Sequence, residues 1–138
     1  MIDDDLSSIS WDALTQAMGW QAQYRLITNW GKCVQVKTDL RCADHLIKGC
    51  EVSAWLACRV ENDTYIFAFD SDSRVINGLA ALLLSSINHK THEQIRAIDL
   101  VRLLSDAGLE KHLTPSRNNG LKAIVERVTW LINNAQPL

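Results

Sequence analysis

The alternation of side chains in residues 52–60 constrains the fold of this chain more than any other feature of its sequence. Successive side chains of a β-strand point to opposite faces, so a period of two predicts a strand with one face on the core. A turn-forming run follows at 61–63, and residues 65–69 alternate again. The two segments therefore predict an antiparallel hairpin. Periodicity indicates no third strand, and we expect one, if it exists, to come from the segment before Gly49.

Most of the other patterned segments predict helices that begin at a capping residue. The predicted starts are Ser10 before a helix from Trp11 that ends ahead of Gly19, Asp70–Ser73 before a helix of residues 75–87, Thr91 with Gln94 as a capping box, Asp99 before residues 100–107, and Thr114 with Pro115 before the last helix. A further amphipathic helix carries Trp20, Tyr24, Ile27 and Gly31 at helical spacing. We expect Trp11, Trp20 and Trp30 to pack in the core, and Gly78 to permit a close approach by the sheet.

Residues 32–48 show no clear period and predict a loop with one short turn at most. The loop is locally basic, because it carries Lys32, Lys37, Arg41 and Lys48. Such a loop is either simply solvated or suited to an acidic partner surface. Residues 1–9 are expected to form a loose acidic lead-in.

Gly49 and Cys50 stand immediately before the predicted hairpin. Glycine suits a sharp bend, which would place Cys50 at the tip of a loop that enters the sheet. Lys48 is a nearby cation and would favour the reactive thiolate. The alternative is a small, buried, apolar cysteine that merely opens the strand.

Length and composition exclude several classes of protein. A chain of 138 residues fits one domain, here residues 1–138, and can bury a core without metals or disulfides. The formal net charge of −2 does not suggest nucleic-acid binding, and no apolar run approaches the roughly 20 residues needed to span a membrane. The start is acidic, unlike a secretory signal, so we expect a cytoplasmic protein with reduced thiols.

A set of residues in this order resembles the SufE family of sulfur acceptors, which includes CsdE. The residues are Gly49-Cys50, Trp55, Asp70-Ser71-Asp72, Gly78-Leu79 and the block from His112 to Leu121. The resemblance runs from about Trp20 to Val128, and the last block is its most specific part. It implies an α+β fold similar to SufE and IscU, with an antiparallel sheet of about three strands and helices packed on one side.

The resemblance also implies a function. Cys50 would accept persulfide sulfur from a cysteine desulfurase similar to SufS or CsdA, stimulate that enzyme and pass the sulfur to an iron–sulfur scaffold or another acceptor. The chain would be an accessory protein and not an enzyme, with no cofactor of its own, because the pyridoxal phosphate belongs to the desulfurase. Lys48, Gly49, Glu51 and Trp55 would contact the partner.

Arg117 is a second candidate site residue. It falls in the first turn of the last predicted helix, where the helix dipole disfavours a cation, so its placement invites a functional explanation. It would support the Cys50 thiolate or the partner, and the alternative is an ordinary solvated arginine.

Other chemistries are weaker alternatives. Cys33, Cys42, Cys50 and Cys58 lie too far apart for a zinc or iron–sulfur scaffold, with Cys42 and His45 as the single close pair, so we expect no metal. No phosphate loop or nucleophile elbow occurs, and helix capping explains Asp70 and Asp72 more simply than catalysis. A thiol redox sensor would use the same Cys50.

Overall fold

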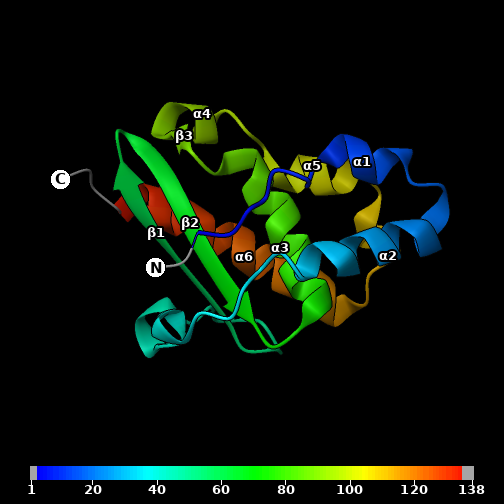
Figure 1. Cartoon of the computed structure of the whole chain (residues 1–138), viewed down its shortest axis with the longest axis horizontal. Helices are drawn as coiled ribbons and strands as arrows, with labels where there is room; N and C mark the ends of the chain where they lie inside the picture. Colours follow the sequence, from blue (N-terminus) through cyan, green and yellow to red (C-terminus); the bar gives the residue numbers. More distant parts are fainter. Residues whose placement is uncertain (1–2, 135–138) are drawn as a thin grey trace.

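Helices cover one face of a three-stranded antiparallel sheet in the computed structural model, which describes residues 3–134 (Figure 1). The elements in chain order are α1 (Trp11–Gln16), α2 (Gly19–Gly31), the 3-10 turns η1 (Thr38–Leu40) and η2 (Ala43–His45), β1 (Ala54–Glu61), β2 (Thr64–Ser71), α3 (Arg74–Ile87), β3 (Lys90–Thr91), α4 (His92–Arg96), α5 (Leu100–Asp106), the 3-10 turn η3 (Leu109–Lys111) and α6 (Pro115–Asn134). The α+β class predicted from the sequence is confirmed. No helix in the described part of the chain is long and apolar enough to cross a membrane.

Strands β1 and β2 form the predicted hairpin, in register from Ala54 opposite Ser71 to Glu61 opposite Thr64. The two residues between the strands, Asn62 and Asp63, both have positive φ, at 52° and 63°. A two-residue turn of this left-handed kind matches the right-handed twist of the strands, and Asn and Asp tolerate it well. Local sequence therefore accounts for the hairpin.

The prediction about the third strand is wrong in its location. Strand β3 follows α3, and its two residues pair with Thr64 and Tyr65 of β2. The segment before Gly49 contributes a single bridge, between Leu46 and Trp55, at the other edge of the sheet. A two-residue strand is too short to show any period, which is why the sequence pattern does not reveal it.

Glycines allow α2 and α3 to cross in close contact. A Cβ atom on Gly78 would lie 1.9 Å from the backbone oxygen of Ile27, and one on Gly31 would lie 2.2 Å from that of Arg74. The lack of a side chain at Gly78 therefore permits a close approach by the backbone of α2. The sequence had suggested a close approach by the sheet, and this expectation is wrong. The three tryptophans expected in the core differ in burial: Trp30 is buried, whereas Trp11 and Trp20 are half-buried.

Side-chain caps begin the helices largely as predicted. Ser10, Ser73 and Asp99 each accept a hydrogen bond from a first-turn amide, and Thr91 forms a complete capping box with Gln94. The carboxylates of Asp70 and Asp72 do not cap α3. Both pair with Arg41, at 2.8 Å in each case, and so connect the end of β2 to the segment after η1.

The acidic N-terminal segment was expected to be loose, but from residue 3 onward it is held against the rest of the fold by ion pairs. Residues 1–2 lie outside the described part of the chain. Asp3 pairs with Arg59, and Asp4 pairs with the buried ammonium of Lys37 at 2.6 Å. Lys37 and Arg41 are thus neutralised within the molecule. Of the four basic residues in the 32–48 segment, Lys32 and Lys48 are exposed to solvent.

Asp70 is expected to make the stability of the protein depend on pH. Burial alone would raise the pKa of this carboxyl group, but the hydrogen bonds from Arg41 and the Lys37 amide, with the charges of both residues, hold it below its ordinary value. A lowered pKa contributes stability at neutral pH that is lost as pH falls through the folded-state value, below about pH 4. Asp70→Asn should cost about 3 kcal/mol at pH 7 and flatten this acid dependence, as measured by urea unfolding at several pH values. Equal stability of variant and wild type at pH 7 would contradict this role.

Candidate functional site

Residues 48–53 form a loop that joins the η2 segment to β1 and carries Cys50. Its base is closed by two backbone hydrogen bonds, from the Ile47 N–H to Ala54 at 2.9 Å and from the Asp72 N–H to Ser53 at 3.2 Å. Gly49 has φ of 91°, a left-handed conformation that other residues adopt only with strain. The predicted glycine bend before Cys50 is thus present, and it turns the thiol toward α6.

Cys50 packs against helix α6. A Cβ atom on Gly120 would lie 3.2 Å from Cys50 Sγ and 3.6 Å from a methyl carbon of Ile76, while one on Gly49 would lie 3.8 Å from Ala123 Cβ. Gly120 therefore leaves space for the sulfur between α6 and α3. The sequence patterns do not single out Gly120, although a glycine inside a long helix costs stability and so signals a packing reason.

Glu51 connects the same loop to the first turn of α6. The Ser116 hydroxyl donates a hydrogen bond of 2.6 Å to Glu51 Oε2. A carboxylate beside the first turn of a helix is favoured by the helix dipole. Cys50 lies one turn further along α6, at Gly120, so the positive end of the helix faces Glu51 and not the thiol.

The surroundings raise the pKa of Cys50, contrary to the expectation of a stabilised thiolate. Burial is the largest cause, the hydrogen bond from the Val52 N–H to the sulfur acts in the opposite direction, and the negative charge of Glu51 raises the pKa further. Lys48, which was expected to favour the thiolate, is exposed to solvent. The closed loop therefore holds Cys50 as a protonated, half-buried thiol at neutral pH.

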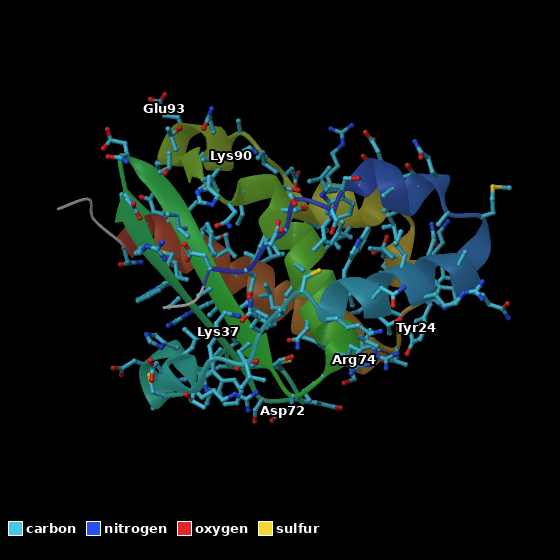
Figure 2. All side chains as sticks on the ribbon, viewed as in Figure 1. Tyr24, Lys37, Asp72, Arg74, Lys90 and Glu93 are labelled. Atoms are coloured by element: carbon cyan, nitrogen blue, oxygen red, sulfur yellow. The ribbon has the colours of Figure 1, made fainter. Side chains whose placement is uncertain are left out.

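Arg117 lies in the first turn of α6, as predicted, but its side chain extends toward α2. Its N–H is capped by the Thr114 hydroxyl, and its guanidinium carbon lies 5.9 Å from the centre of the Tyr24 ring. On the same side of the molecule the Trp20 ring stacks on His112, with ring centres 4.9 Å apart. Figure 2 shows Tyr24 and Arg74 in the half of the molecule in which Asp72 also lies, whereas Lys90 and Glu93 lie at the other end of the sheet.

Trp55 points away from this site. It belongs to the face of β1 opposite α6, where it packs beside Leu40 and Ala57 and under the Arg41 guanidinium, which is 4.6 Å from its ring centre. The period of two places Ala54 and Leu56 on the Cys50 side instead. Trp55 therefore does not shield Cys50, whereas Lys48, Gly49 and Glu51 lie on one exposed loop with the thiol.

The other three cysteines occupy different surroundings. Cys58 is half-buried in β1, where burial raises its pKa to about 11, and Cys33 is half-buried after α2. Cys42 is exposed, with its sulfur 3.2 Å from His45 Nδ1. In residues 3–134 no group of three or more His, Cys, Asp or Glu side chains is arranged to hold a metal ion.

The fold and the loop together define a small α+β protein that carries one half-buried thiol on a glycine bend. A family model described as "SufE: Fe-S metabolism associated domain" matches residues 10–131. An uncharacterized SufE-like protein of Haemophilus influenzae is 34% identical over 119 residues, which cover 85% of this chain and 94% of that one. An uncharacterized SufE-like protein of Rhizobium etli is 30% identical over 114 residues, or 79% of this chain and 77% of that one.

The chain belongs to the SufE family, as the sequence motifs indicated, and this membership supports a role in iron–sulfur metabolism. A solution structure of a hypothetical protein from Thermus thermophilus shares the fold, with a TM-score of 0.73, 16% identity and coverage of 97% of this chain and 98% of that one.

Proposed function

We propose that this protein accepts sulfur on Cys50 from the persulfide of a pyridoxal-phosphate-dependent cysteine desulfurase and relays it toward iron–sulfur cluster assembly in the cytoplasm. The observation that carries the proposal is the packing of Cys50 against Gly120 of α6, on a loop closed at its base and exposed at its tip. Such a thiol is shielded at rest, yet it can be presented by moving six residues.

The transfer step is an exchange at sulfur. The Cys50 thiol loses its proton to solvent or to a base of the partner, and the resulting thiolate attacks the terminal sulfur of the donor persulfide. A new S–S bond forms on Cys50 as the bond between the donor's two sulfurs breaks. The donor cysteine leaves as a thiolate, and Cys50 becomes a persulfide.

The raised pKa of Cys50 in the closed loop suits a sulfur carrier better than a thiol redox sensor. Sensor cysteines are exposed and have a low pKa, whereas burial and the charge of Glu51 raise the pKa of Cys50. A protonated, packed thiol reacts slowly with free oxidants. The same packing would shield a persulfide from free reductants until the loop moves to a partner.

The direct test is a transfer reaction. The protein is incubated with a cysteine desulfurase and free cysteine, and its intact mass is then measured. We expect a gain of one sulfur atom per chain, located on the Cys50 peptide and removed by dithiothreitol. The absence of any sulfur gain, with an active desulfurase, would reject the proposal.

We propose that Arg117 contributes to docking of the desulfurase. Its guanidinium extends from α6 to the Tyr24 ring of α2, 5.9 Å from the ring centre. Arg117→Gln should therefore reduce sulfur transfer several-fold while the melting temperature changes little, because surface substitutions usually alter stability by less than about 0.5 kcal/mol. Desulfurase titrations at two salt concentrations measure this.

The two roles considered for Arg117 give different results. A docking contact predicts that wild-type affinity falls as salt rises, and that the variant loses much of this dependence, because salt screens exposed charges beyond about 10 Å at 0.1 M. Direct support of the thiolate predicts a raised Cys50 pKa in the variant without any partner. Wild-type transfer and an unshifted pKa would show that Arg117 serves neither role.

A further inference from the structure

We propose that the hydrogen bond between Ser116 and Glu51 is a latch that holds the Cys50 loop closed against α6, so that Glu51 is a positioning residue for the thiol. This inference rests on the proposed function for its purpose, since the latch would govern when Cys50 is presented for sulfur transfer. The hydrogen bond is present in the chain alone, and the experiment that tests it needs no desulfurase.

The contacts of the loop show why this one bond is important. The two backbone bonds at Ile47–Ala54 and Ser53–Asp72 fasten the base of the loop and leave its tip free to move. Within residues 3–134, the Ser116–Glu51 bond is the one side-chain hydrogen bond that joins residues 48–53 to a helix. The loop is otherwise attached by packing, of Gly49 and Cys50 against α6 and of Val52 against the core.

The position of the latch on α6 couples it to the thiol. Ser116 and Gly120 are four residues apart, so they lie one above the other on the same face of the helix. Glu51 and Cys50 are adjacent in the loop, and each meets one of these two helix positions. If the Glu51 side chain separates from Ser116, the adjacent Cys50 is no longer held against Gly120.

Glu51 also acts on Cys50 through its charge. Burial is the main cause of the raised pKa of the thiol and the Glu51 carboxylate adds to it, so the closed loop keeps Cys50 both covered and protonated. The other charged groups nearby are directed elsewhere, because Lys48 is exposed to solvent and Arg117 lies over Tyr24. A basic side chain of a partner could draw Glu51 from Ser116, and this would uncover the thiol and remove the opposing charge together.

The test separates the hydrogen bond from the charge, with the full chain alone in solution. Alkylation of the Cys50 peptide by iodoacetamide is followed as a function of pH, and amide hydrogen exchange is followed for residues 48–53. The limiting alkylation rate reports access to the thiol, and the midpoint reports its pKa. Ser116→Ala should raise the limiting rate and the exchange about two- to tenfold, the range expected from loss of one hydrogen bond.

The matched variants give distinct results. Ser116→Ala should also lower the midpoint somewhat, because opening the loop reduces the burial that raises the pKa of Cys50. Glu51→Ala should raise the limiting rate like Ser116→Ala and lower the midpoint further, because it removes the negative charge as well. Glu51→Gln keeps an oxygen that accepts from Ser116, so it should lower the midpoint with a smaller rise in rate. Ser116→Thr should restore wild-type access. Wild-type limiting rate and exchange in Ser116→Ala would overturn the latch, whereas a latch that behaves as expected in a protein that gains no sulfur would reject the proposed function alone.

Discussion

Cys50→Ser is expected to abolish both the gain of one sulfur atom and the stimulation of desulfurase turnover. A hydroxyl group cannot form a persulfide, and its oxygen is a poor nucleophile toward sulfur at neutral pH. The fold should remain intact, because Cys50 is half-buried and serine is nearly the same size. Intact mass after incubation with desulfurase and cysteine, sulfide release under reducing conditions, and the melting temperature measure the three quantities.

The other cysteines provide controls for this experiment. Cys33→Ser and Cys42→Ser should retain most of the activity, since neither residue lies on the 48–53 loop. Full stimulation by the Cys50→Ser variant would contradict the proposed role of Cys50. Loss of the sulfur gain in Cys42→Ser instead would move the acceptor to the exposed thiol beside His45.

Gly78→Ala is expected to cause a large loss of stability. The added Cβ atom would meet the Ile27 carbonyl oxygen at 1.9 Å and the Ile27 carbonyl carbon at 2.8 Å. These are backbone atoms of α2, so the two helices must separate and lose buried contacts. Overpacking of this kind costs about 3 kcal/mol, more than the roughly 1 kcal/mol that alanine gains over glycine in a helix. Thermal and urea unfolding of the variant measure the loss.

Gly120→Ala is the matched control, because Gly120 is also a glycine inside a helix. Its added Cβ atom would meet Cys50 Sγ at 3.2 Å, and this sulfur belongs to a loop that can yield. We expect little loss of stability and faster alkylation of Cys50. Equal stability of Gly78→Ala and wild type would show that α2 and α3 can separate without cost.

Local patterns in the sequence account for the hairpin, the helix starts and the glycine bend. The Asn62–Asp63 turn, the alternation along β1 and the caps at Ser10, Ser73, Thr91 and Asp99 each depend on residues a few positions apart. Their physical causes, which are strand geometry and the hydrogen bonds of first-turn amides, act within one element. The family motifs added the class of protein and the candidate thiol.

Tertiary structure decided which distant groups meet, and this changed the chemistry of the site. Lys48 precedes Cys50 closely in sequence, yet the groups that set the thiol's state are its burial, the Val52 amide and the charge of Glu51. Ser116 and Gly120 reach the loop from α6, more than sixty residues away in the chain. No local period encodes such contacts, because they arise when α6 packs across β1 and the loop folds onto it. The same holds for Gly78, whose neighbour is the backbone of α2 and not the sheet.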